Sequence, residues 1–80
     1  MDTSTAVRQR ILDLCAQRGI TVNRLATLSG VTQSTVNNIV SGRNHSATVA
    51  TVKKLCDGLD ITLRDFFDVS VFDSLEQEIR

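Results

Sequence analysis

Apolar residues recur at helical spacing along most of the chain, and glycine or short polar segments interrupt them. The first apolar set falls at i, i+4, i+7 and i+8, on one helical face: Val7, Ile11, Leu14 and Cys15. This spacing predicts an amphipathic helix over residues 4–18. Thr3 or Ser4 can cap its start, and Gly19 supplies the left-handed residue that ends it.

Two shorter helices are predicted next, with only three residues between them. The first covers residues 22–29 after the cap residue Thr21, and the second covers 33–40 after the cap residue Thr32. Gly30, between the two helices, interrupts the helical pattern. The residues expected to face inward are Val22, Leu25, Ala26, Leu28 or Ser29, Val36, Ile39 and Val40.

A polar loop over residues 43–46 precedes a fourth helix that begins near Thr48. Its apolar face holds Val49, Val52, Leu55, Cys56 and Leu59. Gly58 lies inside that pattern and is expected to cost about 1 kcal/mol relative to alanine. A short fifth helix follows, with Thr62 as its cap and Asp65 three residues on, which approximates a capping box. Its inward residues are predicted to be Leu63, Phe66 and Phe67.

The pattern after Asp68 is compatible with two different structures. Residues 69–71 alternate like a strand, whereas residues 73–76 have the spacing of a capped helix start. The sequence therefore divides into a helical domain over residues 1–68 and a C-terminal tail over residues 69–80.

Composition favours a single all-α domain. Eighty residues enclose one core, and the chain has no Trp, Tyr or Pro, whereas an all-β fold uses more aromatic and turn residues. No segment approaches the roughly 20 apolar residues of a membrane span, and the start lacks the pattern of an export signal. Cys15 and Cys56 are isolated among apolar residues, so we expect two buried, reduced thiols, no metal site and a cytoplasmic protein.

Charge is distributed unevenly, although the net charge is zero. Residues 1–45 carry five arginines and two aspartates, a balance of +3, and residues 46–80 carry four basic and seven acidic residues, a balance of −3. The amino-terminal half could therefore face phosphates while the other half faces away. An ordinary solvated surface can have the same balance, so charge alone does not decide the function.

Four positions have the spacing that two helices joined by a short turn require: Ala26, Gly30, Val36 and Ile39. Ala26 is expected where the second helix crosses the third, and a larger side chain would force the helices apart. Gly30 supplies the left-handed residue of the turn. Val36 and Ile39 anchor the third helix from beneath and leave its other face free. The pattern predicts a helix-turn-helix unit.

The segment around this motif resembles the Cro and lambda-repressor (XRE) family of helix-turn-helix proteins. The resemblance rests on Leu25-Ala26, Gly30-Val31, Gln33-Ser34-Thr35-Val36, Ile39, Ser41-Gly42-Arg43 and the run 51–67. It covers residues 5–68 and implies a compact five-helix, lambda-repressor-like DNA-binding domain. The chain departs from the family at Asp60, where glycine is usual, and at residues 45–47, which replace a proline-containing loop.

The resemblance implies that the third helix enters the major groove of duplex DNA. The outward residues of this helix are uncharged amides and hydroxyls, which suit base edges better than the Glu and Lys of a solvated helix. The residues expected to read bases are Gln33, Ser34 and Asn38, with Asn37 a weaker candidate. Those expected to contact the DNA backbone are Thr21, Thr32, Thr35, Arg43 and Asn44. The alternative is that these polar residues simply cover a surface turn.

The sequence thus predicts a sequence-specific duplex-DNA-binding transcriptional regulator of repressor-like type. No enzyme motif is present, since the sole histidine, His45, has no catalytic or metal-binding pattern around it, and no cofactor or small-molecule ligand is predicted. The alternative function is a protein-interaction module of the same fold, antitoxin-like or anti-regulator. The acidic second half of the chain keeps that alternative open.

A homodimer is also predicted. One short helix offers a single contact to the groove, and family members commonly bind two half-sites with two subunits. The tail contains apolar residues that we expect to form an exposed strip: Val69, Val71, Phe72, Leu75 and Ile79. Residues 69–80 are therefore a candidate dimerisation element. Alternatively, the tail folds back over its own core or frays.

Overall fold

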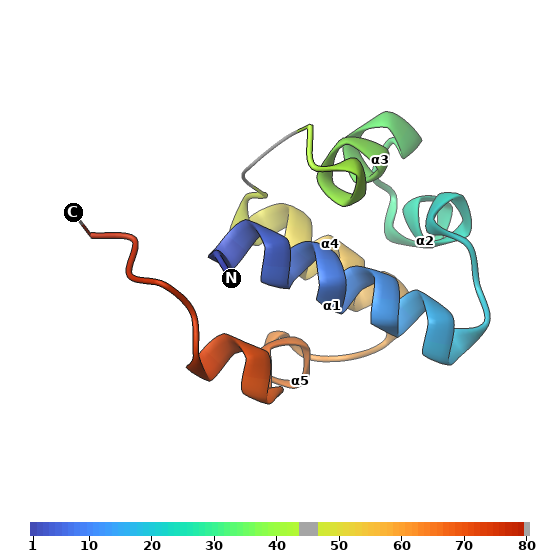
Figure 1. Ribbon diagram of the computed structural model, residues 1–80. Helices are drawn as coiled ribbons and strands as arrows, with labels where there is room; N and C mark the ends of the chain where they lie inside the picture. The colour runs from blue at the N-terminus through green and yellow to red at the C-terminus, as the bar shows by residue number, and fades with distance from the viewer. Residues whose placement is uncertain (44–46, 80) are drawn as a thin grey trace.

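A computed structural model describes residues 1–43 and 47–79 of the chain. In these residues it contains only helices, turns and irregular segments, so the all-α prediction is confirmed there. The helices are α1 (Thr3–Arg18), α2 (Val22–Ser29), α3 (Gln33–Ser41), α4 (Val49–Leu59), α5 (Leu63–Phe67) and a 3₁₀ helix, η1 (Ser70–Asp73). The α2–α3 pair lies at one end of the molecule, and α5 with the tail lies at the other (Figure 1). None of the described helices is long and apolar enough to cross a membrane.

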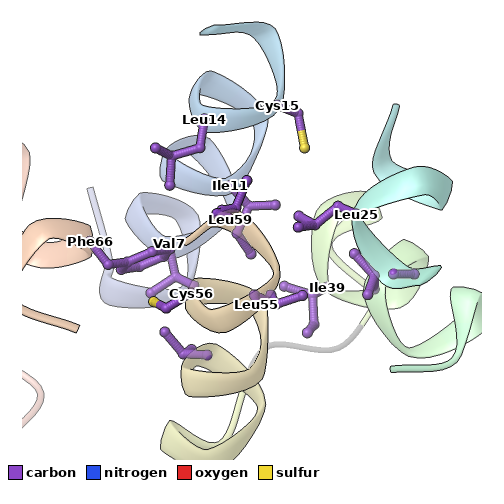
Figure 2. Packing of buried hydrophobic residues seen from close by; sticks show 13 residues of the cluster. Val7, Ile11, Leu14, Cys15, Leu25, Ile39, Leu55, Cys56, Leu59 and Phe66 are labelled. Atoms are coloured by element: carbon purple, nitrogen blue, oxygen red, sulfur yellow. The ribbon is translucent and has the colours of Figure 1, made fainter. Parts of the chain in front are cut away.

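All five α-helices contribute to one hydrophobic core. Its buried members are Val7, Ile11, Leu14, Cys15, Leu25, Ala26, Val36, Ile39, Val52, Leu55, Cys56, Leu59 and Phe66. Figure 2 shows side chains of α1 and α4 meeting at the centre, with Leu25 and Ile39 closing the core from the side of the α2–α3 pair and Phe66 from the opposite side. Burying each Val, Leu, Ile or Phe side chain of this cluster contributes about 1.5–3 kcal/mol, so the core is the main source of stability that holds the helices together.

Three inward predictions need correction or a choice. Val49 is 71% exposed, because it is the first residue of α4 and the buried stripe begins one turn later, at Val52. Phe67 is 41% exposed, because the neighbouring Phe66 takes the core position of this very short helix. Of the alternatives at the end of α2, Leu28 is exposed and Ser29 is the residue that turns inward.

Threonine side chains cap four of the helices, as the sequence predicts for three of them. Thr21, Thr32, Thr48 and Thr62 each accept a hydrogen bond from the backbone N–H three residues on, and Thr62 forms a complete capping box with Asp65. The first helix differs from the prediction. Asp2, not Thr3 or Ser4, is its cap, and Asp2 Oδ1 accepts from the Thr5 N–H at 2.8 Å. A carboxylate is favoured there because it also faces the positive end of the helix dipole.

Helix α2 packs most extensively against α4, and Gly58 makes that approach possible. A Cβ atom at Gly58 would overlap Ser29 Oγ and lie 3.1 Å from the Ser29 Cα atom. The glycine that appears unfavourable in the helical pattern therefore serves a close helix crossing. The hydroxyl of Ser29 is buried there and has no hydrogen-bond partner among the described residues.

The backbone after α4 confirms the expected departure from the family pattern. Asp60 has φ 56° and ψ 44°, the left-handed conformation that ends the helix. Its N–H donates to the carbonyl oxygens of Asp57 and Cys56. Aspartate tolerates this conformation better than most residues, so the helix ends without glycine.

The tail folds back onto the start of α1. Residues 69–71 form no strand, and residues 73–76 do not start an α-helix, because η1 takes up Ser70–Asp73 and packs against α1. The Glu76 N–H donates to the Met1 carbonyl oxygen at 3.2 Å, and the amino terminus pairs with the Glu76 carboxylate. Phe72 packs against the core and lies edge-on to Phe67, with 4.9 Å between ring centroids.

This packing removes most of the predicted exposed strip. Val69, Val71, Phe72 and Leu75 are half-buried in the chain's own fold, and Ile79 alone of the five is fully exposed, at 85%. Of the alternatives at the sequence level, folding back therefore describes residues 69–76 best.

Cys15 and Cys56 are free and buried, as predicted. Burial raises the pKa of both thiols, and nearby Lys53 only partly offsets this effect at Cys56. Both side chains therefore stay protonated at neutral pH and act as small apolar residues.

Candidate nucleic-acid interface

Helix α3 has two chemically distinct faces. Val36 and Ile39 are buried beneath it. Gln33, Ser34 and Asn37 are exposed on the opposite side. The turn before α3 is held by Gly30, which has φ 66° and ψ 26° and whose N–H donates to the Ala26 and Thr27 carbonyl oxygens. A rigid turn and an anchored inner face fix the direction in which the polar face points.

Asn38 lies at the border between the two faces. Asn38 is half-buried, and its backbone carbonyl oxygen accepts a hydrogen bond from the Ser41 hydroxyl at 3.3 Å. The four residues predicted to read bases therefore share one helix, with three exposed and one at the edge of the polar face.

The threonines at the starts of α2 and α3 are capping residues with spare donors. Thr32 Oγ1 accepts from the Thr35 N–H at 3.3 Å and shares a 2.7 Å hydrogen bond with the Thr35 hydroxyl. Since that bond uses one of the two hydroxyl hydrogens, the other remains available to an acceptor such as a phosphate oxygen. Thr21 Oγ1 accepts from the Arg24 N–H at 3.0 Å, which also leaves its hydroxyl hydrogen available.

Asn37 has a partner on the preceding helix. Its Nδ2 donates to Asn23 Oδ1, on α2, at 3.1 Å. Both asparagines are exposed. The sequence analysis did not single out Asn23, because no local pattern indicates a contact between residues 14 positions apart in different helices.

The basic residues of the amino-terminal half do not act as one group. Arg10 Nε donates to the Phe66 carbonyl oxygen at 2.8 Å, and Arg10 Nη2 donates to that of Asp65 at 2.9 Å, so its guanidinium ties α1 to α5. Arg8 instead lies beside the end of α3, where its Nη1 would be 3.0 Å from a Cβ atom at Gly42. It therefore brings a positive charge close to Arg43, which is exposed. Asn44 lies outside the described residues.

The described residues contain no cluster of three or more His, Cys, Asp or Glu side chains that could hold a metal ion. His45 lies outside them. What remains is a polar, uncharged helix face with threonine hydroxyls at one end and arginines at the other. Hydrogen-bond donors and acceptors in this arrangement suit a polyanion with readable base edges.

Fold and surface together define a helix-turn-helix DNA-binding domain. The sequence model of one protein family, the Cro/C1-type HTH DNA-binding domain, matches residues 10–70 of the chain. The chain therefore belongs to the Cro/C1-type helix-turn-helix family, which confirms the resemblance noted in the sequence. This is a family of DNA-binding transcriptional regulators and not a class of enzymes.

Two individual proteins show the same relationship. The chain is 36% identical over 53 residues to RghRB of Bacillus subtilis (strain 168), described as an uncharacterized HTH-type transcriptional regulator. The aligned part is 66% of this chain but only 38% of that relative's length. The crystal structure of the prophage Lp1 protein 11 is similar with a TM-score of 0.81 and 38% identity, covering 94% of this chain and 100% of that one.

Proposed function

We propose that this chain is a sequence-specific, repressor-like transcriptional regulator that reads the major groove of duplex DNA with α3. The observation that carries the proposal is the outer face of α3, where Gln33, Ser34, Asn37 and Asn38 supply amides and hydroxyls without any charge. Glutamine and asparagine can bond adenine through two atoms, and serine can serve several bases.

Backbone contacts complete the proposed interface. The free hydroxyl hydrogens and the first amides at the starts of α2 and α3 would bond phosphates, with Thr21, Thr32 and Thr35 at these positions. Arg43 and Asn44 would contact the backbone beyond the other end of α3, and Arg8 is added to them by its place beside Gly42. Arg10 is not included, because its guanidinium is occupied by α5.

We further propose that the regulator acts as a homodimer in the cytoplasm, where buried thiols stay reduced. Support for the dimer comes from the size of α3, since a helix of nine residues can reach only one half-site of a DNA site. The two α3 helices would then lie about 34 Å apart on a palindromic site. Sedimentation of the full chain at tens of micromolar tests this proposal, and a monomer there would refute it.

Selection of bound duplexes from a random library tests the DNA-binding function. We expect a defined consensus whose affinity falls steeply with salt, because arginines that neutralise phosphates release the counterions bound there. Gln33→Ala or Asn38→Ala should lower affinity for the consensus by about 1–3 kcal/mol and relax the preference at particular base pairs. Arg43→Ala should weaken all sequences about equally and reduce the salt dependence.

Gln77→Ala is the matched control, because Gln77 is an exposed glutamine in the tail. It should leave both consensus and affinity unchanged. If the protein selects no duplex at low salt, the function is wrong. The acidic carboxy-terminal half then favours the second candidate, a protein-interaction module of the same fold.

A further inference from the structure

The hydrogen bond between α2 and α3 suggests a role for a residue outside the reading helix. We propose that Asn23 is a positioning residue for DNA recognition, because it holds the side-chain amide of Asn37 in one orientation on the outer face of α3. The inference rests on the proposed function and adds a specificity-determining residue to it. The contact that carries it is the 3.1 Å hydrogen bond from Asn37 Nδ2 to Asn23 Oδ1.

An exposed asparagine without a partner samples several side-chain rotamers, and fixing one of them on binding costs conformational entropy. Asn37 is exposed, so solvent alone would leave its amide free to rotate. The bond to Asn23 selects one orientation before DNA arrives. Part of the entropic cost of recognition is therefore met during folding.

The bond leaves the recognition chemistry of Asn37 intact. A side-chain amide has two N–H donors and an oxygen with two lone pairs. Asn23 takes one donor, so one N–H and Oδ1 remain. These are the two groups that asparagine needs to bond the N7 and N6 atoms of adenine. The expected target of this position is therefore an adenine.

Asn23 is itself held firmly enough to serve as a support. It lies in the first turn of α2, two residues after the cap residue Thr21. Its carbonyl oxygen accepts from the Thr27 hydroxyl at 3.2 Å. The Gly30 turn then fixes α2 relative to α3, so the separation of the two asparagine side chains is set by the helix-turn-helix unit.

The experiment compares the wild-type protein with Asn23→Ala, Asn37→Ala and the double variant in duplex selection. We expect Asn23→Ala to relax the base preference at the same base pair as Asn37→Ala, by about two- to tenfold. In the Asn37→Ala background, Asn23→Ala should add nothing. Leu28→Ala is the control on α2, since the Leu28 side chain is exposed and has no hydrogen-bonding group, so the substitution should keep the consensus.

A second measurement needs no DNA. In the free protein, the Asn37 side-chain NH₂ resonances should shift in NMR spectra on Asn23→Ala and stay unchanged on Leu28→Ala. Thermal denaturation of each variant checks that the fold is kept.

Several results would overturn the inference. Equal weakening of all duplexes by Asn23→Ala would make Asn23 a phosphate contact, and full additivity with Asn37→Ala would remove the coupling. An unchanged consensus in the Asn37→Ala variant would mean that Asn37 reads no base. If the wild-type protein selects a consensus, any of these results counts against the inference alone. If it selects none, the proposed function fails and the inference fails with it.

Discussion

On one side of the helix-turn-helix unit, α2 lies so close to α4 that Gly58 has no room for a Cβ atom. On the other side, α3 presents Gln33, Ser34 and Asn37 to solvent, where side chains of many sizes would fit. On the packed side, side-chain volume decides which residues fit, because protein interiors are close-packed and even one added methylene group lowers stability. The exposed side is hardly constrained by folding, so its residues are free to be chosen for recognition. Mutations on the packed side should therefore mainly change the stability of the protein, and mutations on the exposed side should mainly change DNA binding.

The largest effect is expected for Ala26→Leu. Ala26 is fully buried on α2, so three extra carbon atoms would force neighbouring helices apart and cost about 3 kcal/mol of stability. Chemical denaturation measures the loss. Ala16→Leu makes the same change at an exposed position of α1 and should alter stability by less than about 0.5 kcal/mol. Equal effects at both positions would contradict the difference between the two sides.

Gly58→Ala should come next. Alanine gains about 1 kcal/mol of helix propensity, but overlap with Ser29 costs about 1–3 kcal/mol, so we expect a net loss of up to about 2 kcal/mol. Ser29→Ala in the same chain should recover part of this loss, because the overlapping Oγ atom is gone. A stabilised Gly58→Ala variant would show that the α2–α4 crossing has spare room.

Ser29→Ala by itself should raise the stability by about 1 kcal/mol. The Ser29 hydroxyl is buried without a hydrogen-bond partner in the part of the chain that the structure describes, so its removal relieves an uncompensated desolvation cost. The shift in the denaturation midpoint reports the gain, with exposed Ser34→Ala as the control. A loss of stability on Ser29→Ala would indicate that the hydroxyl finds a bonding partner such as water.

The smallest effect is expected for Gln33→Ala on the exposed side. Stability should change by less than about 0.5 kcal/mol, since the glutamine side chain is exposed. Thermal denaturation checks this expectation beside the DNA-binding assay. A variant that loses both binding and stability would show that Gln33 serves the fold, which would weaken its assignment as a base-reading residue.

Regular local features were readable from the sequence. The apolar spacing places Val7, Ile11, Val36 and Ile39 in the core, where they are found. The threonines before α2, α3 and α5 are caps, and Asp60 takes the left-handed conformation that its place after a helix requires. These features depend on residues within about four positions of one another, so the sequence displays them directly.

Features that depend on distant residues were not readable. In the sequence Arg10 is only one of the basic residues of the amino-terminal half, whereas the structure places its guanidinium against carbonyl groups at the end of α5. Helical spacing predicts Phe67 inward, because it cannot rank two adjacent phenylalanines in a five-residue helix. Asn23 carried no signal at all. The base-reading role of the α3 residues remains a prediction. The structure shows only that they lie on or beside the exposed face of α3.

The positions of the α-helices, the apolar face of each and the helix-turn-helix unit formed by the second and third follow from the order of residues alone. The close crossing at Gly58, the hydrogen bonds that occupy Arg10 and the packing of the tail on α1 become visible only in the folded chain. The difference lies in the range of the interactions. Caps and helical periodicity act over one or two turns, whereas these three contacts join residues whose separation in space is set by the packing of the whole core.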